Sequence, residues 1–265
     1  EDTPAKPSTA GPGVKVLPAL EIPGLGRQRT LRIYTPPGYA TSNKRYPVLY
    51  MHDGQNLFDD ATSYVGEWKV DETLDALARE GKLELIVVGI DHGNDKRMTE
   101  LNAWSNPYMG AGEGREYVDF IVKTVKPMID RTYRTLPDRA HTAVMGSSMG
   151  GLISHYAITQ YPKVFSKAGV FSPAYWTAPQ AYGYVADKKL PKDARVYLLM
   201  GEKEGGSMVP DVEHMAAVLK QAGHPAQNTV LKIVPGAVHN EGFWSGEFAQ
   251  AVQWMFAPQK QSASR

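Results

Sequence analysis

The sequence contains no cysteine. This absence excludes a thiol nucleophile, a thiolate zinc site and disulfide bonds. The sequence also lacks an excess of either charge, because 29 Lys and Arg residues stand against 28 Asp and Glu residues. A near-neutral chain has no basic footprint for nucleic acid or an anionic membrane, so we expect neither as a partner. No apolar run approaches the roughly 20 residues of a spanning helix, and we expect no membrane span.

The 265 residues, 42% of them hydrophobic, are enough to bury a large core. We expect a single catalytic domain over residues 14–258. Residues 1–13 are rich in Pro, Ala, Ser, Thr and Gly, which is typical of a flexible tether, and residues 259–265 form a polar tail. A tether that begins at Glu1 without methionine resembles what remains after removal of a signal peptide. We therefore expect an exported protein, periplasmic or secreted, with a cytoplasmic one as the alternative.

Short apolar runs alternate with helical patterns along the chain. A strand with alternating polarity is predicted at 30–35, and buried strands at 46–51, 83–90, 141–145, 168–171, 196–200 and 230–234. Helices are predicted at 71–79, 115–130, 152–160, 212–221 and 247–256. This order predicts an α/β fold, a mostly parallel central sheet with helices on both faces. Ligands of such sheets bind at the carboxyl ends of the strands, so the loops there are where chemistry is expected.

The most informative motif is G-x-S-x-G at Gly146, Ser148 and Gly150. A predicted strand runs into it and a predicted helix follows it, which is the context of a nucleophile elbow. The neighbouring Ser147 lacks a glycine two positions before and after it. Ser148 is therefore the predicted nucleophile.

A serine hydroxyl needs a neutral imidazole to accept its proton. His239 follows the last predicted strand and comes after the nucleophile in the chain, so we predict that it is the base. His52 also follows a strand, but it precedes the nucleophile and lies where the oxyanion loop is needed.

The third member of such a site is an acid that orients the imidazole. Glu204 lies three residues beyond Gly201, at the end of the penultimate strand, and is the predicted acid. Asp211 and Glu202, in the same loop, remain alternatives. The order nucleophile, acid, base is that of the α/β-hydrolase fold.

Two backbone N–H groups must also face the developing oxyanion. The N–H of Met149 follows the nucleophile directly, and the N–H of Gln55 lies in the loop after strand 46–51, with Asn56 as the alternative. The aromatic segment 172–184 is too irregular for a long helix and could cap the site, with Tyr175 and Trp176 as candidate substrate contacts.

Several segments together resemble the esterase D type of esterase family within the α/β-hydrolase superfamily. They are Tyr46–Phe58 (YPVLYMHDGQNLF), Gly66–Trp68, Tyr133–Thr135, Gly146–Ile153, Phe171–Pro173 with Trp176, and His239–Glu241 with Trp244. The resemblance spans residues 29–256 and implies a serine acyl hydrolase. Members of the family include siderophore ester hydrolases, feruloyl and acetyl esterases, S-formylglutathione hydrolases and mycolyltransferases. The chain departs from the family at Glu100–Trp104 after Arg97, so substrate contacts do not carry over there.

We therefore expect a serine ester hydrolase that acts through an acyl-enzyme on Ser148, on small, aryl or carbohydrate-linked esters of the acetyl or feruloyl type. The alternatives are an acyltransferase with the same residues, a siderophore ester hydrolase, and a non-catalytic carbohydrate- or ligand-binding protein on the same fold. No cofactor and no metal are expected.

Overall fold

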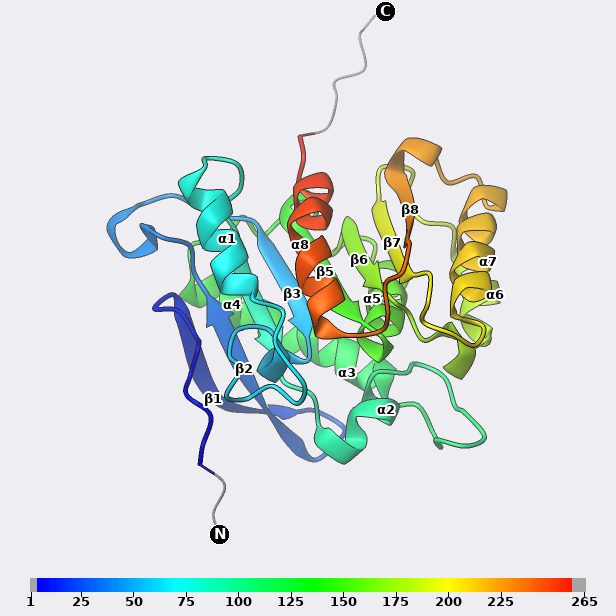
Figure 1. The fold of residues 1–265 in the computed structure, drawn as a ribbon, viewed down its shortest axis with the longest axis horizontal. Coiled ribbons are helices and arrows are strands. Elements are labelled where there is room, and N and C mark those ends of the chain that lie inside the picture. Colours follow the sequence, from blue (N-terminus) through cyan, green and yellow to red (C-terminus); the bar gives the residue numbers. More distant parts are fainter. Residues whose placement is uncertain (1–3, 259–265) are drawn as a thin grey trace, which may run out of the picture.

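A sheet of eight strands forms the centre of the molecule in the computed structural model, which describes residues 4–258 (Figure 1). The strands are β1 (Val14–Ile22), β2 (Arg27–Tyr34), β3 (Val48–His52), β4 (Ile86–Ile90), β5 (Thr142–Ser147), β6 (Lys167–Phe171), β7 (Arg195–Gly201) and β8 (Thr229–Val234). Their order across the sheet is β1-β2-β4-β3-β5-β6-β7-β8. The strands from β4 to β8 in this order are parallel, whereas β1 and β2 pair antiparallel at one edge.

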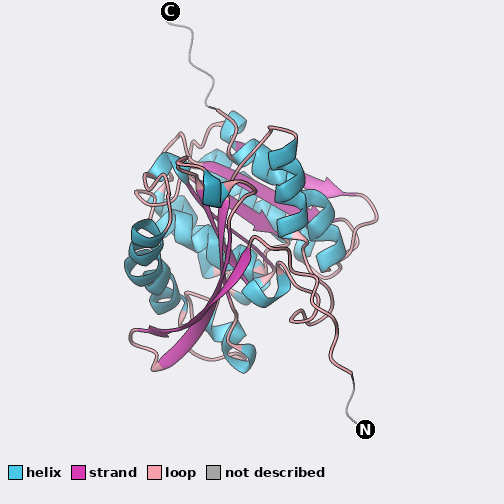
Figure 2. Cartoon of the chain, turned by 90° about the vertical axis from the view of Figure 1, so that its left-hand side faces the viewer, coloured by secondary structure: helices cyan, strands magenta, loops and turns pink. Residues whose placement is uncertain are grey.

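Helices cover both faces of this sheet (Figure 2). They are α1 (Val70–Arg79), α2 (Arg97–Glu100), α3 (Gly114–Phe120), α4 (Lys126–Thr132), α5 (Met149–Gln160), α6 (Gln180–Lys188), α7 (Met208–Gln221) and α8 (Glu241–Met255). The expected α/β fold with a mostly parallel sheet is confirmed.

The alternation of side chains along the strands divides the core into two layers. In β3, Leu49 and Met51 face the layer that α1 and α8 cover, while Val48 and Tyr50 face the layer of α3 to α7. Strands buried on both faces explain the continuous apolar runs of the sequence.

Besides the short helix α2, which was not predicted, three elements differ from the sequence-based expectation. Strand β1 was not predicted, because it contains Pro18 and lies largely exposed at the sheet edge with an irregular register between Leu17 and Leu20. The helix expected at 115–130 is present as a continuous helical run over residues 114–132, with a π-helical segment at Ile121–Val125 in its middle. The aromatic segment expected to be irregular leads into helix α6, in which Ala181 and Val185 are buried.

Part of the expected N-terminal tether lies against the domain. The hydroxyl of Ser8 donates a hydrogen bond to Asp59 (2.8 Å), and the N–H of Gly11 donates one to Asp71 (2.7 Å). Residues 1–3 of the tether and the expected tail at 259–265 lie outside the described residues. None of the helices in residues 4–258 has the length and apolar character needed to cross a membrane.

Candidate active site

Ser148 lies at the sharp turn between β5 and α5. Its backbone has φ 62° and ψ −119°, a combination that costs a non-glycine residue on the order of 1–3 kcal/mol and is found mainly at functional sites. Its N–H donates to the carbonyl of Phe171 (2.9 Å), which ties the turn to the end of β6. Ser147, by contrast, is the last residue of β5 and is buried. The elbow predicted from the sequence is therefore present, with Ser148 at its tip.

The glycines around Ser148 let the strand and the helix approach each other. A Cβ on Gly146 would lie 2.8 Å from the carbonyl oxygen of Gly150, and one on Gly151 would lie 2.7 Å from that of Phe171. A Cβ on Gly150 would make only an ordinary contact, at 3.4 Å from His52. The tightest constraints are thus at Gly146 and Gly151.

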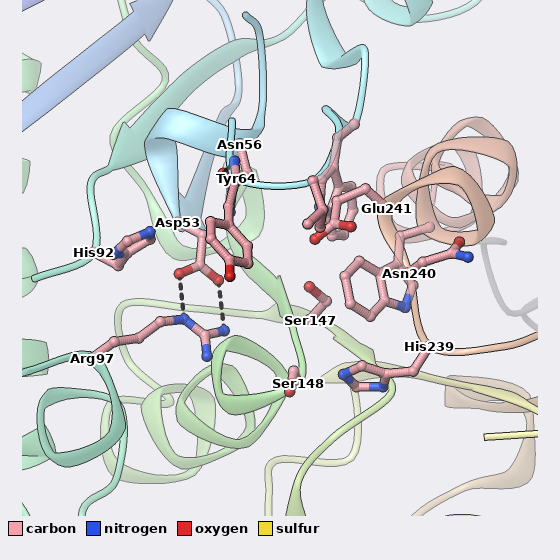
Figure 3. Close-up of a pocket in the computed structure, with 13 residues that line it drawn as sticks. Asp53, Asn56, Tyr64, His92, Arg97, Ser147, Ser148, His239, Asn240 and Glu241 are labelled. Atoms are coloured by element: carbon pink, nitrogen blue, oxygen red, sulfur yellow. Dashed lines mark hydrogen bonds and ion pairs between the residues drawn. The ribbon is translucent and has the colours of Figure 1, made fainter. Parts of the chain in front are cut away.

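His239 and Glu204 form a hydrogen-bonded pair at the ends of β8 and β7. The Nδ1 of His239 lies 2.5 Å from Oε1 of Glu204, whose side chain is fully buried. The other carboxylate oxygen, Oε2, accepts hydrogen bonds from the N–H of Gly201 (2.6 Å) and the hydroxyl of Ser172 (2.6 Å). The imidazole of His239 points toward Ser148 (Figure 3). The structure thus brings the three predicted residues to one edge of the sheet.

The alternative acids are occupied elsewhere. Asp211 lies in the first turn of α7 and accepts a hydrogen bond from the hydroxyl of Ser207 (2.8 Å). Glu202 is exposed and accepts one from the N–H of Gly236 (3.1 Å). Of these three carboxylates, Glu204 is the one paired with His239.

His52, the other histidine that follows a strand, is a core residue. It is 1% exposed, and its Nδ1 lies 2.6 Å from the hydroxyl of Tyr117. Burial lowers the pKa of His52 to about 4, so the ring is neutral at pH 7. The structure gives it no access to a substrate.

The predicted oxyanion donors remain available. Within residues 4–258 the backbone N–H groups of Gln55 and Met149 have no acceptor, whereas that of Asn56 donates to the carbonyl of Asp53 (2.9 Å). Reciprocal hydrogen bonds between the side-chain amide of Gln55 and the backbone of His92 (2.8 and 3.2 Å) hold this loop. These bonds favour Gln55 over Asn56 as the second donor.

A cavity of about 370 Å³ opens beside Ser148 and His239 (Figure 3). Its walls combine aromatic and charged side chains, among them Tyr64, Trp68, Asp53, Arg97 and Glu241. Asp53 accepts two hydrogen bonds from the Arg97 guanidinium (2.7 and 3.0 Å). Burial alone would raise the pKa of Asp53, but this ion pair outweighs burial and lowers it. Burial raises the pKa of Glu241 above its ordinary value.

A second cavity, of about 500 Å³, shares Ser148 and His239 with the first. Trp176, 55% exposed, and the loop Gly205–Met208 line it. Tyr175, in contrast, is fully buried, and its hydroxyl bonds to Nδ1 of His155 (2.7 Å). The prediction that Tyr175 contacts the substrate is therefore wrong, while Trp176 is placed where it can do so.

Sequence reasoning assigned no role to Ser172 or to the Asp53–Arg97 pair. Asp53 and Ser172 directly follow a strand and lie in segments that resemble the family, while Arg97 begins the short helix α2. A position after a strand is shared by many ordinary turn residues and assigns no role by itself. Within residues 4–258, no group of three or more His, Asp or Glu side chains is arranged to hold a metal ion.

Comparisons with known proteins show the family to which the chain belongs. The model of the Esterase family, described as "Putative esterase", matches residues 22–255. The uncharacterized protein YbbA of Bacillus subtilis is 28% identical over 242 residues, which cover 86% of this chain and 92% of that protein.

Two further proteins are similar over most of the chain. An endo-1,4-beta-xylanase/feruloyl esterase of Xylanibacter ruminicola is 24% identical over 239 residues, which cover 87% of this chain but only 30% of that protein. The crystal structure of an IroE-like serine hydrolase from Shewanella oneidensis superposes with a TM-score of 0.75 at 21% identity, covering 92% of this chain and 80% of that one. The chain belongs to the Esterase family and has the α/β-hydrolase fold, and it is an esterase, an enzyme that hydrolyses carboxylic esters.

Proposed function

We propose that the enzyme hydrolyses its ester in two steps through an acyl-enzyme on Ser148, with His239 as the base and Glu204 as the acid that orients it. The observation that carries this proposal is the strained backbone of Ser148 beside an imidazole whose far nitrogen is held at 2.5 Å by a fully buried carboxylate. A serine, a base and an orienting acid in this relation are the recurring unit of acyl transfer.

In the first step, the Oγ of Ser148 attacks the ester carbonyl carbon while its proton passes to Nε2 of His239. The carbonyl oxygen becomes an oxyanion, which the backbone N–H groups of Met149 and Gln55 stabilise. The intermediate collapses when His239 returns the proton to the leaving alcohol, and the acyl group remains on Ser148.

In the second step, water gives a proton to Nε2 of His239 and its oxygen attacks the acyl carbonyl. Collapse of this intermediate releases the carboxylic acid and restores the proton to Ser148. An alcohol in place of water would make the same enzyme an acyltransferase.

The two cavities support small esters with an aryl or carbohydrate part as substrates. The exposed indole of Trp176 offers a face for stacking on an aromatic acyl group or a sugar ring. The cavity with Tyr64, Asp53 and Arg97 offers hydrogen-bonding groups for hydroxyls. The relative from Xylanibacter ruminicola is named a feruloyl esterase, which favours this class over siderophore esters.

A fluorophosphonate probe tests the nucleophile. We expect one adduct, which peptide mapping places on Ser148. Ser148→Ala should lose the adduct and the hydrolysis of p-nitrophenyl acetate, while Ser147→Ala keeps both. An adduct on Ser147, or an active Ser148→Ala enzyme, would sink the assignment.

A second assay addresses the substrate and the acceptor. Rates with feruloyl, acetyl-xylan and siderophore-type esters rank the acyl and alcohol parts. Addition of an alcohol to the p-nitrophenyl acetate and butyrate assays separates the two reaction types, because an acyltransferase forms the new ester and a hydrolase releases acid.

A further inference from the structure

We propose that Ser172 and Trp244 are positioning residues, which hold the carboxylate of Glu204 and the imidazole of His239 together as one rigid unit. This inference rests on the proposed function, because it needs Glu204 and His239 to be the acid and the base. It adds two residues that act on the reaction through Glu204 and His239: Ser172, which is fully buried, and Trp244, which also lines the cavity beside Ser148.

Ser172 is bonded on both sides. It is fully buried at the end of β6, and its hydroxyl donates to Oε2 of Glu204 (2.6 Å) while it accepts from the indole Nε1–H of Trp244 (2.9 Å). An indole nitrogen can only donate, so the single proton of the Ser172 hydroxyl is left for the carboxylate. The direction of this chain is therefore fixed: Trp244 donates to Ser172, and Ser172 donates to Glu204.

The carboxylate of Glu204 depends on these donors. With the bonds from Gly201 and Ser172 on Oε2 and the bond from His239 on Oε1, three donors hold a side chain that solvent does not reach. Hydrogen bonds to a buried charged group are stronger than neutral ones, and losing one leaves part of the charge without compensation. Removal of the Ser172 hydroxyl would let the carboxylate turn away from His239.

Trp244 contacts the other end of the same pair. Its indole packs edge-on against the imidazole of His239, with ring centroids 4.9 Å apart and an interplanar angle of 86°. Trp244 is itself 4% exposed, lies in the first turn of α8 and packs against Trp68. One side chain thus restrains the plane of the imidazole directly and the carboxylate through Ser172.

The backbone at Ser172 supports a functional use of its side chain. Its φ of 43° lies in the left-handed region, where glycine would fit without strain. Asp53 and Ser148, which follow β3 and β5 as Ser172 follows β6, also have positive φ, at 57° and 62°. Strained residues gather where the surrounding structure holds a functional geometry.

The test compares variants that lack single hydrogen bonds. Ser172→Ala and Ser172→Gly both remove the hydroxyl, but only glycine also relieves the positive φ. Trp244→Phe removes the Nε1–H and keeps an aromatic ring against His239. We expect each to lower kcat for p-nitrophenyl acetate by about 10- to 100-fold, as loss of a hydrogen bond to a charged group predicts, with KM within about twofold.

Matched controls separate this role from general packing. Ser166 is a buried serine directly before the first residue of β6, at the opposite end of the strand from Ser172. Trp254 lies near the C-terminal end of α8, ten residues after Trp244. We expect Ser166→Ala and Trp254→Phe to leave kcat within about threefold of the wild type, since neither contacts Glu204 or His239.

A double mutant gives the decisive readout. If Ser172 acts through Glu204, Ser172→Ala should cost nothing further in a Glu204→Gln background, because residues that act as one unit are not additive. An equal loss of kcat in both backgrounds, or full activity of Ser172→Gly, would overturn the proposal. Thermal unfolding and the downfield Nδ1–H resonance of His239 show whether each variant folds and keeps the pair.

The fluorophosphonate reaction separates this proposal from the proposed function. If wild-type Ser148 is labelled and Ser172→Ala is labelled at the same rate, only the positioning role fails. If wild-type Ser148 is not labelled at all, the proposed function fails and the positioning role fails with it.

Discussion

Replacement of Glu204 by glutamine is the most stringent change for the proposed site. Glutamine has nearly the same shape, so the fold should be kept, but one oxygen becomes an NH2 group. The two positions of the wild-type carboxylate are not equivalent, because Oε2 accepts from the backbone N–H of Gly201 and from Ser172, while Oε1 faces His239 alone.

This asymmetry decides how the glutamine amide is oriented. A backbone N–H cannot become an acceptor, and Ser172 must donate toward residue 204 because Trp244 donates to it. The amide oxygen therefore takes the place of Oε2, and the NH2 group faces Nδ1 of His239. Nδ1 must then accept, so the imidazole carries its proton on Nε2, the nitrogen that should take the proton from Ser148.

The expected loss follows from this tautomer. A carboxylate-to-amide change that leaves the geometry intact but imposes the wrong tautomer costs about 10⁴-fold in kcat in the serine protease triad. For Glu204→Gln we expect a loss of about 10³- to 10⁴-fold in kcat and little change in KM, since substrate contacts are unaltered.

Steady-state hydrolysis of p-nitrophenyl acetate measures this loss, and thermal unfolding verifies the fold. Asp211→Asn and Glu202→Gln are the controls, because each neutralises a carboxylate that is near Glu204 in the sequence and hydrogen-bonded elsewhere. We expect both variants to stay within about threefold of the wild type. The reasoning fails if Glu204→Gln retains a tenth of the activity. A larger loss in Asp211→Asn would move the acid to that position.

Two further outcomes concern the histidines that follow strands and the buried carboxyl group of Asp71. His239→Ala should lower kcat by about 10³-fold or more, whereas His52→Gln should lower the melting temperature and keep kcat within about tenfold in steady-state assays; the reverse would make His52 the base. Burial raises the pKa of Asp71 to about 7, so the folded chain keeps a proton that the unfolded chain releases near pH 4, and stability falls as pH rises between these values. Asp71→Asn should therefore raise the free energy of unfolding at pH 8 by about 2–4 kcal/mol and by much less at pH 4.5 in urea titrations, and an equal gain at both would contradict this.

The sequence allowed the layers of the fold and the three proposed site residues to be predicted, for the same physical reason. Each buried strand of a parallel sheet gives an apolar run in the sequence. Because these strands all point in the same direction, the residues that follow the runs meet at one edge of the sheet. Ser148, Glu204 and His239 all follow predicted strands. The structure adds the distance between His239 and Glu204 and the burial of the Glu204 carboxylate, which the sequence does not contain.

The sequence-based predictions were wrong where the local pattern of polar and apolar residues does not show whether a side chain is buried. Strand β1 lies at the edge of the sheet with most of its side chains exposed, and its proline is tolerated there because an edge strand need not donate on both sides. Tyr175 and Trp176 are adjacent aromatic residues, yet Tyr175 is fully buried and Trp176 is 55% exposed. Aromatic content alone does not distinguish a core contact from a cavity wall.

The residues to which the sequence assigned no role all contact partners that are distant in the chain. Trp244 bonds to Ser172 across 72 positions, and Arg97 bonds to Asp53 across 44. Periodicity reports the environment along one element and carries no information about which side chain faces it from another element. A serine after a strand and a tryptophan in a helix are each ordinary alone. Their proposed role arises only because the sheet brings the ends of β6 and β7 beside the start of α8.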